Sequence, residues 1–581
     1  MEYIEPYDDD VKPISEPLAS SYINVISEKE ELDAETFLQH LQKQKENDND
    51  AFVFLDSEGN RRDVLTFRGW NESSQDMAVS LLSIGVKSGD FVGIISPNCR
   101  ELIITFGALL HINAIPVLLT FDLKSGKDVA KKIRDCNIKT VMVEMCGDSK
   151  KREIVDELFG KVLRGERDET MPDLKHVLIV AENVPPGAID VATLMKEKSE
   201  SERQTVQGLA DCVTKDSPVF VLLTSGSTGD PKYCLVPHRA HINISKNIKE
   251  RSRLTEGKRY FNDRPFSWAG GVTAISSALV GPCTVVTIDA RYTVAKSSAE
   301  MVLKILEQET ISHAVVLPYL MYDIDKLERA NCHLPSWECT FTGGQRVDAD
   351  MVERYKVKTK TGVMTIYGAT ECGFASSLFP FASFTKQYGT VGYPFPHNEI
   401  SIRDINSNDV LPSNTQGEIC VRGPLVFLGY LNNKEATREA LQEDGWYHTG
   451  DIGSLTPYGY IIVAGRLKEF IKRGTTILQP LEIERVLLEH PGIHQVQAVG
   501  VPDPRLFEEV CACILPESGM TLTIDDIKAW CDGLYDSKVS ADGLGSRPKY
   551  FIILEEFPLL SNGKVDRVTL KMNAAKSLGL D

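Results

Sequence analysis

Residues 219–232 read VFVLLTSGSTGDPK, and this stretch decides how the rest of the 581-residue chain is interpreted. Its first five residues, 219–223, have the length and composition of a buried strand. The apolar run passes directly into hydroxyl and glycine residues and ends in Lys232. Glycines let backbone N–H groups converge on an oxyanion, hydroxyls supply further donors, and the lysine adds a positive charge. The stretch therefore predicts a phosphate-binding loop at the end of a strand.

The spacing of this loop is not that of the nucleotide-binding pattern GxxxxGK[ST], so a different kind of phosphate loop is expected. A flexible Ser/Gly turn is the competing interpretation. The density of hydroxyl groups, glycines and a terminal lysine within nine residues favours phosphate binding. The candidate phosphate contacts are Thr224, Ser225, Gly226, Ser227, Thr228, Gly229 and Lys232.

On either side of the loop, short apolar runs alternate with helix-length amphipathic segments. Strand-like runs begin at Phe91, Thr140 and Val177. This alternation predicts an α/β fold in which helices cover largely parallel sheets. After about Gly465 the elements become shorter, with helices expected at 480–490 and 524–534 and strands at 496–501 and 510–515. We expect a large N-terminal domain over residues 1–466 and a small, mobile α+β domain over residues 467–581.

Charge and cysteine usage exclude several classes of protein. A net charge of −18 argues against binding driven by the charge of nucleic acid or of an anionic membrane. The 13 cysteines lack CxxC pairs and read as reduced thiols, with Cys511 and Cys513 on a buried strand and not in a metal site.

The acidic N-terminus lacks the pattern of a targeting signal, so a cytoplasmic location is expected. The apolar stretch 101–123 contains His111, Asn113 and Pro116, which favour a helix and a buried strand over a membrane span.

A second candidate motif, residues 367–371, reads YGATE. It offers an aromatic face for a base, a hydroxyl donor for a phosphate and a hard carboxylate oxygen for magnesium. The same pentapeptide is also compatible with an ordinary turn at the end of a strand. Residues 446–451 read WYHTGD, in which Asp451 is an acceptor-only side chain suited to ribose hydroxyls. Without further context, an aspartate such as Asp451 is more often a turn or helix-cap residue.

Near the C-terminus, residues 558–567 read PLLSNGKVDR. Asn-Gly is a strong signal for a tight turn, and Lys564 directly follows it. A lysine at such a tip can reach a distant site, although a lysine taken alone is usually a solvated surface residue.

Taken together and in this order, these motifs resemble the adenylate-forming superfamily, which comprises acyl-CoA synthetases, firefly-type luciferases and the adenylation domains of nonribosomal peptide synthetases. The resemblance extends from about Thr66 to Arg567 and is greatest to a stand-alone acyl-CoA synthetase. Members of the superfamily share this motif order, so each motif supports the others.

The resemblance implies a role for each matched residue. Residues 224–232 would hold the phosphates, Tyr367 and Gly368 would lie against adenine, and Gly343, Gly344 and Gln345 would flank it. Thr370 would reach the α-phosphate and Glu371 would bind Mg²⁺, while Asp451 and Arg466 would contact the ribose. Lys564 would bridge the carboxylate and the α-phosphate. The implied catalytic residues are Lys232, Thr370, Glu371 and Lys564.

Further residues acquire roles only through the resemblance. Lys468 would be the hinge, Lys472 and Arg473 would face coenzyme A, and Trp268 would line the acyl pocket or simply pack in the core. The chain departs from the usual pattern at Phe507, which replaces a glycine, at residues 473–477 and in a long stretch at 536–547. These departures lie in the small domain and bear on the thioester step more than on adenylation.

The implied reaction is ATP-dependent activation of a carboxylic acid through an acyl-adenylate, followed by transfer to coenzyme A with Mg²⁺ as cofactor. One alternative keeps adenylation but delivers the acyl group to a carrier protein or another acceptor. A second alternative is a non-catalytic protein that binds nucleotide or acyl ligands. The identity of the acid and the oligomeric state stay open at the level of sequence.

Overall fold

The computed structural model describes residues 16–26, 31–56, 58–119, 126–145, 149–224, 231–288, 298–328, 332–345, 347, 349–381, 389–474, 476–535, 546–560 and 564–580. Contacts divide the chain into two units. The first comprises residues 1–401, 420–449 and 456–461, and the second comprises 402–419, 450–455 and 462–581. The predicted domain boundary after residue 466 stays a prediction.

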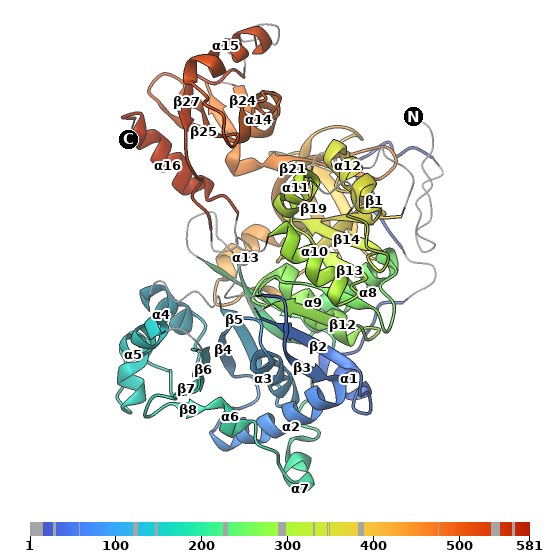
Figure 1. Ribbon diagram of the computed structural model, residues 1–581, viewed down its shortest axis with the longest axis vertical. Helices are drawn as coiled ribbons and strands as arrows, with labels where there is room; N and C mark the ends of the chain where they lie inside the picture. The colour runs from blue at the N-terminus through green and yellow to red at the C-terminus, as the bar shows by residue number, and fades with distance from the viewer. Residues whose placement is uncertain are drawn as a thin grey trace. The chain divides into compact units, whose positions relative to one another are not determined.

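An eight-stranded sheet in the first unit carries the start of the predicted phosphate loop (Figure 1). Strands β9, β5, β4, β6, β7 and β8 pair in parallel, whereas β10 and β20 add an antiparallel edge. In spatial order the strands are β20 (Gly429–Tyr430), β10 (Lys232–Pro237), β9 (Pro218–Thr224), β5 (Ile115–Leu119), β4 (Phe91–Ile95), β6 (Thr140–Glu144), β7 (His176–Val180) and β8 (Ile189–Asp190).

A nine-stranded sheet forms the other half of the first unit. It is parallel from β2 to β15 and ends in antiparallel strands on both sides. The order is β17 (Tyr393–Pro394), β16 (Gly373–Ser377), β15 (Gly362–Ala369), β14 (Cys339–Gly343), β13 (His313–Val315), β11 (Arg259–Phe261), β12 (Thr284–Ile288), β2 (Asp50–Leu55) and β3 (Arg61–Thr66).

Helices cover these sheets because apolar strands buried on both faces need apolar cover on both sides. Residues of β4, β5, β6 and β7 share a core with α4 and α5, and residues of β2, β11, β12, β13 and β15 share a second core with α10, α11 and α12. The helices of this unit are α1 (Phe37–Lys43), α2 (Phe67–Ser83), α3 (Arg100–His111), α4 (Gly126–Asp135), α5 (Ser149–Leu163), α6 (Val191–Leu194), α7 (Glu200–Arg203), α8 (His238–Ser252), α9 (Ala269–Leu279), α10 (Ala299–Gln308), α11 (Pro318–Lys326), α12 (Ala349–Thr359) and α13 (Lys434–Ala440), with a 3-10 turn η1 (Gln204–Val206).

A further sheet has the order β1 (Tyr22–Asn24), β18 (Glu399–Arg403), β19 (Gly417–Arg422), β21 (Tyr447–Leu455) and β22 (Ile461–Arg466). The division between the two units runs through its last four strands. The large sheets with covering helices and the smaller C-terminal unit confirm the predicted α/β class.

The second unit is built around the long hairpin of β25 (Ile493–Asp503) and β26 (Phe507–Pro516). Along β26, Val510, Ala512 and Ile514 face one apolar cluster, and Cys511 and Cys513 face another. This period of two confirms that both cysteines lie on a buried strand. The remaining elements are β23 (Ile471–Arg473), β24 (Thr476–Leu478), β27 (Tyr550–Ile553), α14 (Pro480–Leu488), α15 (Ile524–Tyr535), α16 (Arg567–Ser577) and a 3-10 turn η4 (Leu467–Glu469).

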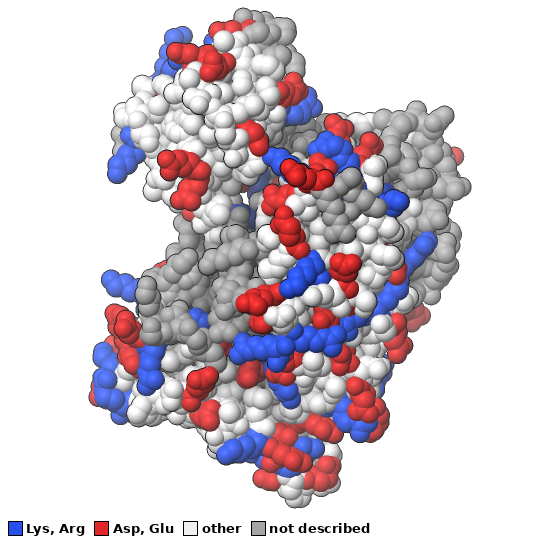
Figure 2. All heavy atoms as spheres, in the orientation of Figure 1, with Lys and Arg blue, Asp and Glu red and all other residues white. Residues whose placement is uncertain are grey.

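Two further observations concern helix length and surface charge. Within the described part of the chain, no helix combines the length and the apolar character that crossing a bilayer requires. Figure 2 shows both basic and acidic side chains on the visible face of the first unit, with a band of Lys and Arg side chains running across it beside clusters of Asp and Glu.

Candidate active site

The two ends of the predicted phosphate loop lie opposite each other on neighbouring strands. Thr224 is the last residue of β9 and Lys232 is the first of β10, and the antiparallel pairing sets them directly across from each other. Residues 225–230, with the predicted contacts Ser225, Gly226, Ser227, Thr228 and Gly229, lie outside the described residues. The loop therefore begins and ends at the carboxyl end of β9, the edge at which parallel α/β sheets bind ligands.

Lys232 packs on an aromatic ring contributed by a distant part of the chain. Its Nζ lies 4.6 Å from the ring centroid of Tyr430, on the two-residue strand β20 that pairs with β10. A cation over the face of an aromatic ring is attracted by the ring quadrupole. The contact holds the ammonium group at the loop without neutralising it.

The same tyrosine reaches the predicted magnesium ligand. The hydroxyl of Tyr430 donates to Oε1 of Glu371 over 2.9 Å, and both residues are buried. The backbone carbonyl of Glu371 accepts a hydrogen bond from the N–H of Phe427 over 2.8 Å. Strand β15 ends at Ala369, so Thr370 and Glu371 form the turn that leads into β16. The structure thus brings Thr224, Lys232 and Glu371 to one side of the first unit.

Cys234 lies next to this cluster and does not act as a nucleophile there. Burial, reinforced by the negative charge of Glu371, raises the pKa of the Cys234 thiol well above its usual range. The thiolate is the reactive form of cysteine, so this residue stays inert.

The residues predicted to flank adenine come from two adjacent parallel strands. Gly343 ends β14 and pairs with Ile366 of β15, directly before Tyr367 and Gly368. A Cβ on Gly343 would meet the carbonyl oxygen of Ile366 at 2.4 Å, so only glycine permits this approach. Gly344 has a φ of +78°, and Gln345 is exposed beside it. The pairing brings the two sequence motifs to the same edge of the nine-stranded sheet.

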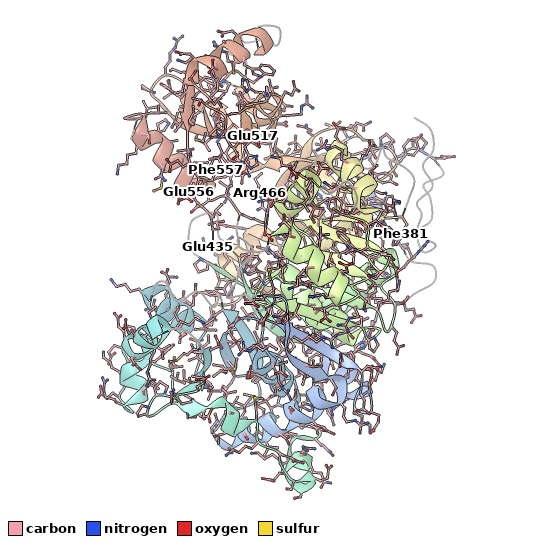
Figure 3. All side chains as sticks on the ribbon, in the orientation of Figure 1. Phe381, Glu435, Arg466, Glu517, Glu556 and Phe557 are labelled. Carbon is pink, nitrogen blue, oxygen red and sulfur yellow. The ribbon has the colours of Figure 1, made fainter. Side chains whose placement is uncertain are left out.

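The remaining nucleotide contacts predicted from sequence lie in the second unit. Asp451 of β21 is buried, and its Oδ1 lies 2.7 Å from Nε of Arg466. Arg466, which is labelled in Figure 3, is the last residue of β22. Lys564 is exposed as a residue, yet the surrounding protein desolvates its ammonium group. This desolvation and the positive charge of Arg466 lower the pKa of Lys564, while Asp451 and Glu469 act in the opposite direction.

The segment that carries Lys564 is anchored on both sides. Leu559 and Val565 form an isolated antiparallel bridge, and the N–H of Leu560 donates to the carbonyl of Lys564 over 2.8 Å. Three residues further on, Nη2 of Arg567 donates to Oε1 of Glu484 over 2.7 Å and to the carbonyl of Ala498 over 2.8 Å. Residues 561–563 of this segment lie outside the described residues.

The other predicted site residues are placed as follows. Trp268 is half-buried directly before α9, and Lys468 lies in the 3-10 turn η4 after β22. Lys472 is exposed on β23, whereas Nε of its neighbour Arg473 forms an ion pair with buried Glu509 over 3.0 Å. An arginine paired in this way has less of its charge available for a ligand than Lys472 has.

Sequence reasoning missed two residues that contact the predicted site residues or their anchors. Tyr430 lies outside the motifs described above, and Glu484 falls within the helix expected at 480–490. The only local signal for Tyr430 is an aromatic side chain directly after a glycine. Its contacts depend on pairing between strands far apart in sequence, which the local pattern does not reveal.

Comparison with known proteins agrees with the family resemblance of the sequence motifs. The family model of the AMP-binding enzyme matches residues 39–431, and the model of the AMP-binding enzyme C-terminal domain matches residues 482–564. The chain is 29% identical to the mitochondrial medium-chain acyl-CoA ligase ACSF2 of Danio rerio, over 98% of this chain and 93% of that protein. It is 28% identical to the putative acyl-CoA synthetase YngI of Bacillus subtilis, over 92% of this chain and 95% of that protein.

Solved structures share the fold. The o-succinylbenzoate CoA synthetase of Bacillus subtilis, in complex with its acyl-adenylate intermediate, aligns with a TM-score of 0.74 at 22% identity, over 93% of this chain and 99% of that chain. The anthranilate CoA ligase AuaEII aligns with a TM-score of 0.77 at 20% identity, over 95% and 99% of the two chains. The first family model alone spans more than half of the sequence, and the motifs occur in the predicted order. This chain belongs to the AMP-binding enzyme family.

Proposed function

We propose that this protein is an AMP-forming acid–thiol ligase, which activates a carboxylic acid with ATP and transfers the acyl group to coenzyme A. The observation that carries the proposal is the cluster of Lys232 and buried Glu371 around Tyr430, at the mouth of a loop rich in hydroxyls and glycines. The names of the relatives, an acyl-CoA ligase and an acyl-CoA synthetase, support the same reaction.

In the first step, a carboxylate oxygen attacks the α-phosphorus of ATP, the acyl–adenylate bond forms and pyrophosphate leaves. Two anions meet in this step, so its barrier is mainly electrostatic and positional. Lys232 would hold the phosphates, and the hydroxyl of Thr370 would orient the α-phosphate. Lys564 would neutralise charge where the carboxylate meets phosphorus, and Asp451 and Arg466 would bind the ribose.

The residues present fit a magnesium ion. Glu371 supplies a hard carboxylate oxygen, the type of ligand that Mg²⁺ prefers. A carboxylate has about four lone-pair sites, so its bond with Tyr430 leaves capacity for a metal. When bound, Mg²⁺ offsets the negative charge of the triphosphate.

In the second step, the thiol of coenzyme A attacks the acyl carbon and AMP leaves. Lys468 would act as the hinge that lets the small domain turn between the two half-reactions. Lys472 and Arg473 are the proposed contacts of the anionic coenzyme. Because Arg473 is already paired with Glu509, Lys472 is expected to contribute more.

The decisive experiment measures two activities of the purified protein. Carboxylate-dependent exchange of labelled pyrophosphate into ATP is expected with at least one class in a panel of short, medium, long and aromatic acids. Addition of coenzyme A is then expected to convert adenylation into thioester formation. Exchange at background with every acid refutes an adenylating enzyme. Exchange without thioester indicates a carrier protein or another acceptor.

The finer assignments are part of the same proposal. Trp268 is proposed to line the acyl pocket, and replacing it with alanine should change the preference among acids of different length. A cytoplasmic location is also part of this proposal. The ACSF2 relatives carry the description mitochondrial, so imaging of the full chain with a C-terminal tag is the appropriate test.

A further inference from the structure

We propose that Tyr430 is a positioning residue that holds the magnesium ligand Glu371 and the phosphate lysine Lys232 in place while keeping their charges apart. The inference rests on the proposed function, because it assigns Tyr430 a role in the same phosphate site. It goes further by identifying one side chain that fixes the positions of both the carboxylate and the ammonium group of that site.

Two different parts of the tyrosine make the two contacts. The ring face receives Nζ of Lys232 at 4.6 Å from the centroid, and the hydroxyl donates to Oε1 of Glu371 over 2.9 Å. Among the described ion pairs, none joins Lys232 to Glu371. A direct pair would neutralise both charges, and binding ATP and a metal would then require breaking it. The tyrosine ring orients Lys232, the hydroxyl orients Glu371, and neither contact neutralises a charge.

Tyr430 is itself tightly fixed. Cys234 of β10 lies across from it in the sheet, and the N–H of Tyr430 donates to Oγ1 of Thr437 over 2.9 Å. The ring of Phe427 lies 4.9 Å from the ring of Tyr430, and the N–H of Phe427 binds the carbonyl of Glu371. The segment 427–430 therefore holds Glu371 through both its backbone and its carboxylate.

The glycine before Tyr430 is required by this arrangement. Gly429 has a φ of +135°, a conformation that other residues rarely adopt. A Cβ at this position would lie 2.8 Å from Cγ2 of Thr437, the residue that binds the N–H of Tyr430. The Gly-Tyr pair thus explains why the short strand β20 can bring an aromatic side chain to the loop.

Two substitutions separate the two contacts. Tyr430→Phe removes the hydroxyl donor and keeps the ring, whereas Tyr430→Leu removes both. Partners of metal ligands typically change metal affinity by about 10- to 100-fold when they are lost. We therefore expect Tyr430→Phe to raise the Mg²⁺ concentration for half-maximal ATP binding about tenfold, with ATP binding in EDTA unchanged. Tyr430→Leu should also weaken ATP binding in EDTA.

Isothermal titration calorimetry with ATP, at a series of Mg²⁺ concentrations and in EDTA, measures the Mg²⁺ requirement and the metal-free affinity without turnover. Tyr447→Phe is the matched control, because Tyr447 is also buried and packs 5.8 Å from the ring of Phe427. Thermal unfolding of each variant confirms folding. The inference is overturned if Tyr430→Phe leaves the Mg²⁺ dependence unchanged, or if it weakens ATP binding equally with and without Mg²⁺. If the wild type is active and Tyr430→Phe has the same Mg²⁺ dependence of ATP binding as the wild type, only this inference is refuted. If the wild type is inactive, the proposed function is refuted.

Discussion

The two lysines of the proposed site differ in how the fold holds them. Lys232 begins a strand of the eight-stranded sheet and packs on Tyr430, so strand pairing and an aromatic ring determine its position. Lys564 lies on an exposed segment of the second unit, and the side chains that influence its charge are Arg466, Asp451 and Glu469 of the same unit. In the proposed mechanism, Lys232 contacts the phosphates throughout nucleotide binding, whereas Lys564 takes part in one half-reaction only.

This difference has a functional consequence. A charge needed throughout binding gains from rigid placement, because preorganised groups cost no rearrangement during reaction. A charge needed in only one half-reaction gains from a segment that can be brought in and withdrawn. Variants of the second unit should therefore impair one half-reaction more than the other, whereas variants around Lys232 should change the affinity for the nucleotide.

The largest effect is expected from Lys564→Ala. Loss of a charge placed for the transition state should lower adenylation by on the order of a hundredfold or more. ATP affinity should change little, and thioester formation from supplied acyl-adenylate should stay near the wild-type rate. Pyrophosphate exchange and single-turnover thioester assays measure the two steps. Lys528→Ala, an exposed lysine in α15, is the control, and equal loss in both steps would contradict the comparison.

A smaller effect is expected from Glu484→Gln. Glu484 is buried, accepts from the N–H of Ala498 over 2.8 Å and pairs with Arg567, which follows Lys564 in the chain. Weakening this anchor should displace Lys564 and lower pyrophosphate exchange about tenfold, because small misplacements of a catalytic group are costly.

The double variant tests the mechanism of that loss. In a Lys564→Ala background, Glu484→Gln should lower exchange no further, since the two residues would act as one unit. Additive losses in the double variant would mean that Glu484 acts on the fold and not through the lysine.

The lowered pKa of Lys564 predicts a pH dependence. In the proposed mechanism the protonated lysine is the active form, so adenylation should fall as pH rises through a pKa that lies below the ordinary value for lysine. Lys564→Arg should move this alkaline limb to higher pH, because a guanidinium stays charged. The pH profile of pyrophosphate exchange measures the alkaline limb of the wild type and of the variant. Circular dichroism at each pH checks that both proteins stay folded. An identical limb in the two proteins would assign it to another group.

The smallest effect concerns the stability of the second unit. Phe507 has a φ of +66° and is 79% exposed at the hairpin tip where the sequence pattern led us to expect a glycine. Phe507→Gly should relieve strain of about 1–2 kcal/mol, partly offset by the greater freedom of glycine in the unfolded chain.

A small rise in the unfolding midpoint of the second unit is therefore expected, with unchanged pyrophosphate exchange. Phe507→Ala keeps the strained backbone and serves as the control. A gain in the alanine variant equal to that in the glycine variant would refute backbone strain as the cause.

Several elements were predictable because their signals are local. The run 219–223 lies within β9, and the helix expected at 480–490 is observed as α14 with an end two residues earlier. The strand expected at 510–515 lies within β26, where alternate residues face two different apolar clusters. Apolar length and periodicity depend on neighbours in sequence, so each could be read from a short window.

The sequence by itself determined the family, the order of the motifs and the types of side chain that the chemistry needs, because these are written in contiguous residues. Tertiary structure alone decided that Tyr430 joins Glu371 to Lys232, and that Glu484 anchors the segment of Lys564. These contacts join residues 59, 198 and 83 positions apart. Contacts over such separations depend on which strands pair and in which register, and that choice is made by the packing of the whole unit.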